Sequence, residues 1–239
     1  MKYLLTGCTS GIGLKIAIDL MQRGDHVHGL GCRRISLRSE LPEELRTNKN
    51  FSFSAVDLRH LNELEGSLKD LKREFSGVVL CAGATNQYKK FDEISTEEAL
   101  DNLKVNFVAN TLIIKNMKNI LYDLGSVIII SSNTLTLGGS PFNAIYSASK
   151  SALETYAIAA QKSFFENKIR VNIIRPGLIN SGMNKKVSGY SEERYKQRVK
   201  MVPVGRAGET QDVSNMVQYL LDDKSQYIFG QTISISGGE

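Results

Sequence analysis

The sequence contains few cysteines, histidines and prolines, and it has no long apolar run. Its three cysteines, Cys8, Cys32 and Cys81, form no CxxC pair, so we expect neither a disulfide framework nor a metal site. No stretch is long enough to span a membrane, and the N-terminus carries no signal-peptide pattern. We therefore expect a cytoplasmic protein, in a reducing compartment, with no membrane partner.

Charge is nearly balanced along the chain. The formal net charge is +5, but lysine and arginine are interspersed with acidic residues and form no basic patch with interleaved aromatics. This pattern favours a solvated surface and predicts no nucleic-acid partner. Because 239 residues contain only four prolines and no repeat or linker, we predict a single domain over residues 1–239.

Short apolar runs alternate with longer segments of helical period. The predicted strands are KYLLT (2–6), HVHGLG (26–31), FSFSAV (51–56), GVVLCA (77–82), SVIII (126–130), RVNIIR (170–175) and QTISIS (231–236). The predicted helices cover residues 13–22, 62–75, 96–121, 146–165 and 211–221. This alternation predicts an α/β fold: a Rossmann-type, doubly wound, seven-stranded parallel sheet with helices on both faces. Ligands of such sheets bind beyond the carboxyl ends of the strands.

A glycine-rich turn follows the first predicted strand. The sequence TGCTSGIG, residues 6–13, places Gly7, Gly11 and Gly13 between a strand and a helix. Glycines there allow a tight turn and close approach of the backbone to a pyrophosphate, and the helix N-terminus offers unpaired N–H groups. No Gly-Lys-Ser/Thr follows, so the turn is not a Walker loop. The strand–turn–helix context predicts dinucleotide binding.

The second predicted strand indicates which dinucleotide fits. A carboxylate about 20 residues past the turn would bind the ribose 2′-hydroxyl of NAD, whereas an arginine suits the 2′-phosphate of NADP. The sequence GLGCRRISLR, residues 29–38, has no carboxylate and supplies Arg33 and Arg34. We therefore predict NADP(H) as the cofactor, with NAD(H) as the alternative. Asp57, after the third strand, either accepts from the adenine amine or caps the next helix.

The sequence AIYSASK, residues 144–150, places Tyr146 and Lys150 four residues apart on a predicted helix. Residues at this spacing share a helix face. One interpretation is an ordinary helix surface; the other is a proton-transfer site, which the accompanying dinucleotide motif favours.

The ordered set of motifs resembles the short-chain dehydrogenase/reductase family over nearly the whole chain. The matching segments are TGCTSGIG (6–13), LCAG (80–83), VNF (105–107), IISS (129–132), YSASK (146–150), RVNIIRPGLINSGM (170–183) and YIFGQTISISGG (227–238). The resemblance implies an oxidoreductase that interconverts a carbonyl and a secondary alcohol by hydride transfer.

The resemblance assigns catalytic positions to Asn106, Ser132, Tyr146 and Lys150. Ser132 is preferred to Ser131, which would point to the opposite face if the strand continued. By position, Asn106 would hold a relay water and Lys150 the nicotinamide ribose. The cofactor contacts implied by the family pattern, together with those proposed above, are Gly7, Thr9, Ser10, Gly11, Ile12, Gly13, Arg33, Arg34, Asp57, Leu58, Cys81, Ala82, Gly83, Tyr146, Lys150, Pro176, Gly177, Ile179 and Ser181.

Tyr146 is the expected general acid and base. A free phenol has a pKa of about 10, and an ammonium about 4 Å away interacts with a phenolate by roughly 4 kcal/mol at an effective dielectric of about 20. We therefore expect Lys150 to lower the pKa of Tyr146 by up to about three units before desolvation opposes the shift. Ser132 would donate to the substrate oxygen as negative charge develops.

Several positions depart from the family pattern. Leu80 and Cys81 stand where two asparagines are usual, which removes an expected polar contact to the neighbouring strand. Ser10 stands where many NADP-dependent members carry a basic residue. The general pattern, including VPVGRAGETQDV (202–213), is nearest to 3-oxoacyl-[acyl-carrier-protein] reductases. However, Ser126 and Asn167 occupy places where those enzymes use arginines to dock the acidic carrier.

The sequence therefore does not select one substrate. A 3-oxoacyl thioester, a small ketone and a sugar intermediate all fit a small-molecule carbonyl or alcohol site beneath a lid at about 180–208. The rival to an enzyme is a dinucleotide-binding regulator or scaffold without turnover. A sugar-nucleotide epimerase or dehydratase would need a larger C-terminal domain. The resemblance also implies a homodimer or homotetramer, formed through the helices at 96–121 and 146–165.

Overall fold

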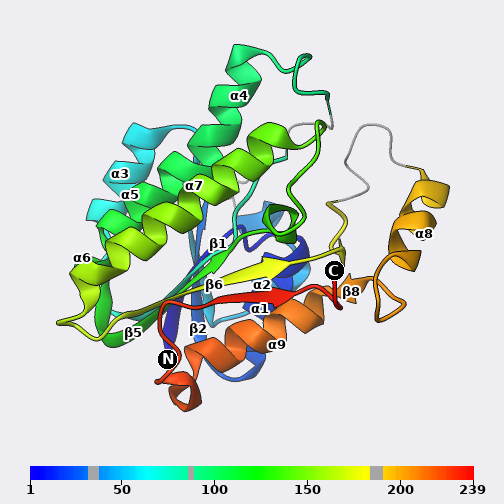
Figure 1. The fold of residues 1–239 in the computed structure, drawn as a ribbon. Helices are drawn as coiled ribbons and strands as arrows, with labels where there is room; N and C mark the ends of the chain where they lie inside the picture. Colours follow the sequence, from blue (N-terminus) through cyan, green and yellow to red (C-terminus); the bar gives the residue numbers. More distant parts are fainter. Residues whose placement is uncertain (32–37, 86–88, 184–190) are drawn as a thin grey trace.

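The computed structural model describes residues 1–31, 38–85, 89–183 and 191–239, with the side chain of residue 38 left out. Its main sheet has seven parallel strands in the order β3-β2-β1-β4-β5-β6-β9 (Figure 1). The strands are β1 (Lys2–Thr6), β2 (His26–Gly31), β3 (Phe51–Ala55), β4 (Phe75–Leu80), β5 (Leu121–Ile130), β6 (Arg170–Pro176) and β9 (Thr232–Ile235). The predicted Rossmann-type fold is confirmed.

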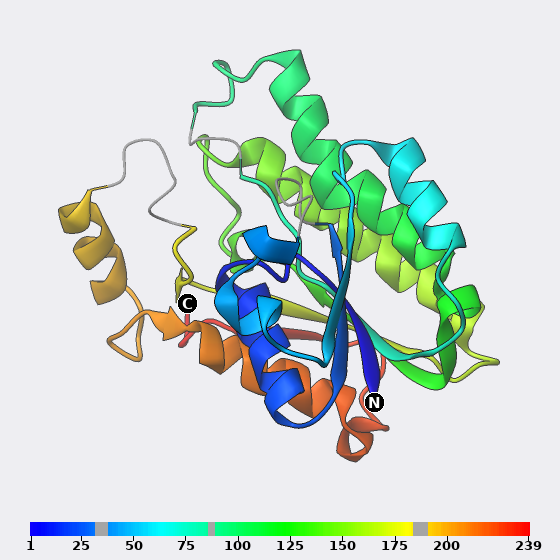
Figure 2. The ribbon, with the colours of Figure 1, turned by 180° about the vertical axis from the view of Figure 1, so that it is seen from behind.

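Helices cover both faces of this sheet, as Figures 1 and 2 show from opposite sides. One layer contains α1 (Gly11–Gln22), α2 (Glu43–Arg46) and α9 (Thr210–Leu221); the other contains α3 (Leu61–Lys69), α4 (Thr96–Leu103), α5 (Ala109–Lys115), α6 (Met117–Ile120) and α7 (Ala144–Ala160). Each layer buries its own apolar cluster against the sheet. The central strands are consequently buried on both faces, which explains their continuous Val and Ile runs.

Three predicted helices end earlier than their helical period suggested. The helix predicted over 146–165 ends at Ala160 and is followed by a 3₁₀ turn over Gln161–Phe164. The segment predicted as one helix over 96–121 consists of α4, a π-helical turn at Lys104–Val108, α5 and α6, and it ends at Ile120. The segment predicted as a helix over 62–75 ends at Lys69. The reason for the ends of these last two is strand pairing: Phe75 and Leu121 begin β4 and β5 and face each other in the sheet. Tertiary pairing therefore overrides the local helical preference.

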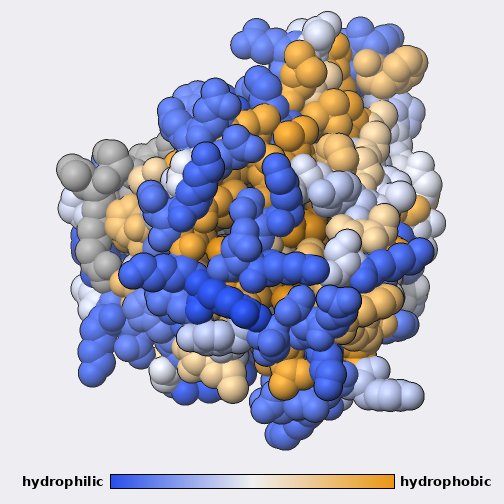
Figure 3. Space-filling model, turned by 90° about the vertical axis from the view of Figure 1, so that its left-hand side faces the viewer, coloured by the Kyte–Doolittle hydropathy of each residue, from blue (hydrophilic) through white to orange (hydrophobic). Residues whose placement is uncertain are grey.

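The face in Figure 3 is largely hydrophilic over its left and lower parts, and hydrophobic residues gather toward its upper right. Helix α3 itself buries Leu64 and Leu68 and exposes residues such as Glu63 and Lys69. No helix in the described part of the chain is both long and apolar enough to cross a membrane.

The predicted lid contains three small elements. They are β7 (Ile179–Asn180), α8 (Glu192–Lys200) and β8 (Gly208–Glu209), and β7 pairs with β8. Helix α8 buries none of its residues and stands beyond the tips of β6 and β9 (Figure 1). It is tied to the rest of the molecule by an ion pair between Arg198 and Glu239. After α8 the chain returns to the body at Val202, which is buried.

Two histidines on β2 form a polar ladder with serines on β3. His28 places Nδ1 2.9 Å from Ser52 Oγ and Nε2 3.0 Å from Ser54 Oγ, and His26 Nε2 lies 2.9 Å from Ser52 Oγ. Burial lowers the pKa of His28 to about 4, and the charge of Lys2 acts in the same direction. The pKa of His26 is lowered by the same two causes. Both rings are therefore neutral at neutral pH.

This ladder predicts acid-sensitive stability. A histidine in the unfolded chain titrates near pH 6.5, whereas folded His28 resists protonation down to about pH 4. As the pH falls through that window the unfolded state binds the proton first, so stability is lost by up to about tenfold per pH unit in the unfolding constant. We expect His28→Gln to flatten this dependence in urea unfolding measured across the window.

The exposed His60 provides the matched control for this prediction. His60→Gln should keep the pH dependence of the native chain, because its ring is largely accessible to solvent. A His28→Gln protein whose stability falls with acid as steeply as that of the native chain would contradict the role given to the ladder.

Candidate active site

The turn between β1 and α1 requires glycine at several positions. Gly7 and Gly11 have φ values of 71° and 55°, in the left-handed region that favours glycine. A Cβ on Gly7 would lie 2.8 Å from the Cα of Ala82, and a Cβ on Gly13 would lie 2.1 Å from the carbonyl oxygen of Gly7. These close approaches let the first turn of α1 pack directly against the ends of β1 and β4.

The N-terminus of α1 suits a phosphate group. Ser10, the N-cap residue, makes no side-chain capping hydrogen bond, and the first turn of the helix contains no acidic residue. Its N–H groups and the positive end of the helix dipole are thus available to an anion. Ser181 packs against Gly11, since a Cβ there would lie 3.0 Å from the Ser181 oxygen. Thr9 and Ile12 belong to the same turn, so the predicted phosphate contacts are brought together.

Thr6 supplies the polar contact that Leu80 and Cys81 cannot make with their side chains. Its Oγ1 accepts from the backbone N–H groups of Cys81 and Ala82, both at 3.0 Å. Thr6 itself is fully buried at the end of β1. This hydroxyl therefore ties β1 to the segment after β4, where the adenosine half of a dinucleotide is expected to lie. The sequence motif contained Thr6, but its role was not foreseen.

Asn106 lies in the π-helical turn and is fully buried. Its Oδ1 accepts from the N–H of Ala84 at 2.8 Å, and its Nδ2 donates to the Ala84 oxygen at 2.8 Å, to Asn102 Oδ1 and to Ser149 Oγ. The side chain thus fixes the segment after Gly83 and contacts α7. Such turns are frequent at functional sites. The relay-water role assigned by resemblance stays a prediction.

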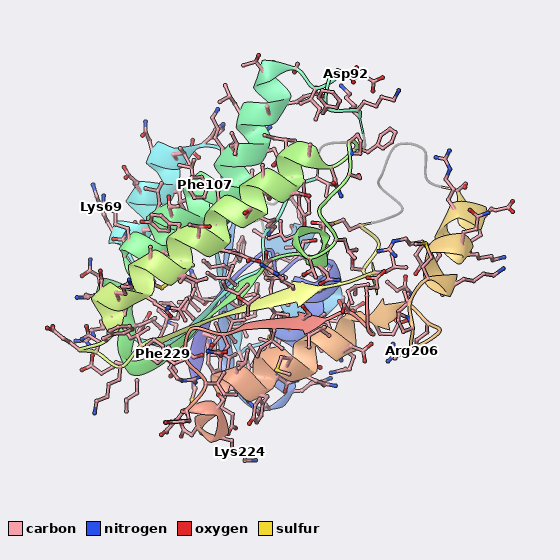
Figure 4. The ribbon with its side chains drawn as sticks, in the orientation of Figure 1. Lys69, Asp92, Phe107, Arg206, Lys224 and Phe229 are labelled. Carbon is pink, nitrogen blue, oxygen red and sulfur yellow. The ribbon has the colours of Figure 1, made fainter. Side chains whose placement is uncertain are left out.

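The Asn106 turn also packs against α7 at a second point. Phe107 meets Tyr156 of α7 edge to face, with the ring centroids 6.2 Å apart. Figure 4 shows Phe107 at this junction of the helical layer. The two contacts together hold the helix that carries Tyr146 and Lys150.

Lys150 occupies the centre of the candidate site. Its side chain is 3% exposed, and its Nζ donates to the carbonyl oxygen of Ile130 at 2.9 Å, at the end of β5. The Nζ lies 6.0 Å from the centroid of the Tyr146 ring. A Cβ on Gly83 would lie 3.4 Å from the same nitrogen and 3.5 Å from Asn106 Oδ1. The structure therefore brings Asn106 and Lys150 together around Gly83, and the Tyr146 ring lies at the stated distance from the Lys150 amine.

Burial governs the acid–base properties of this centre. It lowers the pKa of Lys150 to about 8, against the opposing effects of Cys81 and Glu154. Burial also raises the pKa of the Cys81 thiol to about 12, with Lys150 opposing the rise. At neutral pH the amine is therefore mostly an ammonium and the thiol is neutral.

The two candidate serines both follow β5, which ends at Ile130. The extended backbone continues beyond it, since the N–H of Ser131 donates to the Ile174 oxygen at 2.8 Å and Ser132 itself is extended. The Oγ of Ser132 accepts from the N–H of Thr134 at 3.3 Å and lies 3.1 Å from Thr134 Oγ1. Ser131 Oγ is buried and has no partner within the described part of the chain. Ser132 remains the predicted substrate contact.

The remaining predicted cofactor residues fall into three groups. Pro176, Gly177 and Ile179 follow one another at the end of β6 and the start of β7. Leu58 is buried beside Gly31. Arg33 and Arg34 lie outside the described residues.

Asp57 is engaged by a neighbour on its own turn. Both of its carboxylate oxygens accept from Arg59, at distances between 2.6 and 3.1 Å. It does not cap α3, whose N-cap residue is His60 and has no side-chain cap. The alternative of a helix cap is therefore wrong, because the carboxylate closes the turn before the helix. Its contact with adenine stays a prediction.

Glu239 is a further residue of the site that the sequence did not reveal. Its Oε2 accepts from the N–H of Leu178 at 3.1 Å, and a Cβ on Gly177 would lie 2.6 Å from the same oxygen. Its backbone oxygen lies 3.4 Å from Asn133 Nδ2. The far end of the chain thereby supports the turn that follows β6. No local pattern marks this contact, since the partners are far apart in sequence.

Known proteins resemble this chain in both sequence and fold. A family model described as Enoyl-(Acyl carrier protein) reductase matches residues 7–239. The 3-oxoacyl-[acyl-carrier-protein] reductase FabG of Rickettsia felis is 32% identical over 98% of this chain and 95% of its own length.

Two solved structures illustrate the likeness in fold. A short-chain type dehydrogenase/reductase from Mycobacterium ulcerans has a TM-score of 0.84 and 26% identity, over 99% of this chain and 88% of that one. The angucycline C-6 ketoreductase LanV with bound NADP has a TM-score of 0.87 over 99% of this chain and 94% of that one. At 22% identity, LanV supports the fold alone.

The Thr6 contact leads to a stability prediction. Thr6→Val keeps the shape of the side chain but leaves the N–H groups of Cys81 and Ala82 without their acceptor. Because unsatisfied buried donors cost about 1–3 kcal/mol each, we expect the free energy of unfolding in urea to fall by about 2 kcal/mol or more. Thr47→Val is the control, since its hydroxyl bonds the Glu43 oxygen at an exposed site. Equal unfolding midpoints for the two variants would exclude the proposed tie.

Proposed function

The chain belongs to the short-chain dehydrogenase/reductase family, and we propose that it is an NADP(H)-dependent enzyme interconverting a carbonyl and a secondary alcohol. The observation that carries the proposal is the placement of Lys150. Its buried Nζ is anchored on the Ile130 oxygen, beside both the Tyr146 ring and Gly83. Gly83 continues from β4, whose neighbour β1 leads into the glycine turn. Proton-transfer groups and phosphate cradle thus share one edge of the sheet.

The residues of the site divide the chemistry between them. A bound nicotinamide supplies the hydride for reduction and accepts it in oxidation. Tyr146 gives its phenolic proton to the carbonyl oxygen in reduction and takes it back in oxidation. The Lys150 ammonium stabilises the phenolate that this transfer leaves behind. Ser132 donates a hydrogen bond to the substrate oxygen as negative charge develops on it.

The preference for NADP(H) rests on the sequence after β2. That segment offers Arg33 and Arg34 and no carboxylate, which suits a 2′-phosphate. The phosphate cradle at Gly7–Gly13 accommodates either dinucleotide, so the arginines carry the distinction.

The proposed substrate is a small carbonyl compound or the corresponding alcohol. Relatives such as the Rickettsia felis protein act, by name, on 3-oxoacyl groups carried by acyl carrier protein. In this chain Ser126 is buried and donates to the Leu220 oxygen, and Asn167 donates to Asp123. Neither offers a cation to an acidic carrier, so we include free 3-oxoacyl thioesters and small ketones in the proposal. We also propose that the protein works in the cytoplasm as a homodimer or homotetramer.

Removing the Tyr146 hydroxyl tests the reaction. A positioned general acid contributes about 10²–10⁴-fold, so we expect Tyr146→Phe to reduce turnover by that factor while NADPH binding is kept. The assay is NADPH oxidation across a panel of 3-oxoacyl thioesters, keto esters and cyclic ketones. Tyr156→Phe, on the same helix, is the control and should retain turnover. NADPH binding without oxidation on any substrate of the panel would instead favour the regulator or scaffold.

The cofactor preference has its own test. Loss of a charge-assisted hydrogen bond costs about 1.5–3 kcal/mol, which corresponds to about 10- to 150-fold in affinity. We expect Arg33→Ala to weaken NADPH binding by this factor and to leave NADH binding nearly unchanged, as measured by fluorescence titration. Arg46→Ala on the nearby α2 serves as the control. Equal loss for both dinucleotides would rule out the 2′-phosphate assignment.

A further inference from the structure

An ion pair that the proposed reaction does not use lies behind the candidate site. Arg175 donates from Nε to Glu154 Oε1 at 2.9 Å and from Nη2 to Glu154 Oε2 at 2.6 Å, in a bidentate arrangement. The Glu154 side chain is 7% exposed and that of Arg175 is 26% exposed. The third guanidinium nitrogen, Nη1, donates to Thr136 Oγ1 at 3.2 Å. One guanidinium therefore joins three separate segments.

Each of these segments carries part of the candidate site. Glu154 lies one helical turn beyond Lys150 on α7. Arg175 is the residue before Pro176 on β6. Thr136 closes the short helical turn that follows Ser132. A shift of any segment would separate the serine, the lysine and the turn after β6 from one another.

Two groups raise the pKa of Lys150 against burial, first Cys81 and then Glu154. The groups around the ammonium are the Ile130 carbonyl from β5, the Cys81 thiol after β4, and Tyr146 and Glu154 from α7 itself. Cys81 is neutral at neutral pH because burial raises its pKa to about 12. Glu154 raises the pKa of Lys150 against the burial that lowers it.

Arg175 completes this arrangement by holding the Glu154 carboxylate in place. Its hydrogen bonds with Glu154 raise the pKa of the guanidinium, so its own charge is secure. Buried charges persist when they are paired and hydrogen-bonded, and both carboxylate oxygens are satisfied here. The pair thus keeps a fixed negative charge one turn behind the amine.

We propose that Glu154 and Arg175 are positioning residues for the reaction. Their ion pair clamps α7, the Ser132 segment and the end of β6 together, and it fixes a carboxylate one helical turn from Lys150. The clamp acts through Lys150 and does not itself touch substrate. The expected effect of the clamp on turnover rests on the proposed function. Its expected effect on the charge of Lys150 can be measured without any substrate.

The decisive experiment follows the Lys150 amine directly. In protein labelled with ¹⁵N-lysine, the Nζ signal of Lys150 is assigned by its loss in Lys150→Arg and is titrated with pH. Glu154→Gln removes the charge and keeps the shape of the side chain. We expect the Lys150 midpoint to fall by about half a pH unit or more. Asp123→Asn is the control, because it neutralises an exposed carboxylate paired with Arg73 and should leave the midpoint unchanged.

A second variant guards against unfolding of the first. Glu154→Leu combined with Arg175→Met replaces the pair by apolar side chains, a change that buried ion pairs often tolerate. Its Lys150 midpoint should fall as in Glu154→Gln, and the alkaline limb of the kcat/KM profile for carbonyl reduction should move to lower pH with it. A midpoint that stays at the native value in either folded variant overturns the inference. Absence of turnover in the native chain would sink the proposed function alone, because the titration does not depend on turnover.

Discussion

The hydrogen bond from the Lys150 ammonium to the Ile130 carbonyl is the contact on which the site depends. A buried amine is costly unless its donors are satisfied, and this bond provides an acceptor at the end of β5. It also ties α7 to the sheet, while the neighbouring Ser149 accepts a hydrogen bond from Asn106 within the helical layer. Tyr146, one turn before Lys150, takes its place from this anchoring. Helix α7, the end of β5 and the Tyr146 side chain are therefore held in fixed positions relative to one another.

Close backbone packing connects the Lys150 site to the glycine turn between β1 and α1. Gly83 leaves room for both Lys150 and Asn106, and Gly7 leaves room for Ala82 on the same segment. A Cβ on Gly7 would lie 2.8 Å from the Ala82 Cα and push the segment after β4 away from the turn before α1, whereas a Cβ on Gly83 would only touch Lys150 and Asn106. Thr6 then holds the segment by its backbone N–H groups. The chemistry and the cofactor cradle are thus linked through a short stretch of main chain.

The sequence was informative where a feature depends on neighbouring residues. Continuous Val and Ile runs marked the buried strands, and the spacing of Tyr146 and Lys150 marked their shared helix face. Features that depend on distant segments could not be predicted from the sequence. The early ends of two helices, for example, follow from the pairing of Phe75 with Leu121 in the sheet. The partnership of Glu154 with Arg175 joins residues whose local surroundings carry no sign of each other. The arrangement of strands and helices brings such residues together, so their contact can be seen only once the fold is known.

The replacement of the family asparagine by Cys81 shows how a departure from a motif can leave a site intact. The polar contact between neighbouring strands is made by the Thr6 hydroxyl to backbone N–H groups, which every residue except proline carries. The side chain at position 81 is therefore not needed for the contact between the strands, and it can be apolar. A thiol there adds no charge beside Lys150, because burial keeps it protonated. An acidic side chain at the same place would hold the amine far more firmly as an ammonium, and the balance between burial and Glu154 would no longer set its charge.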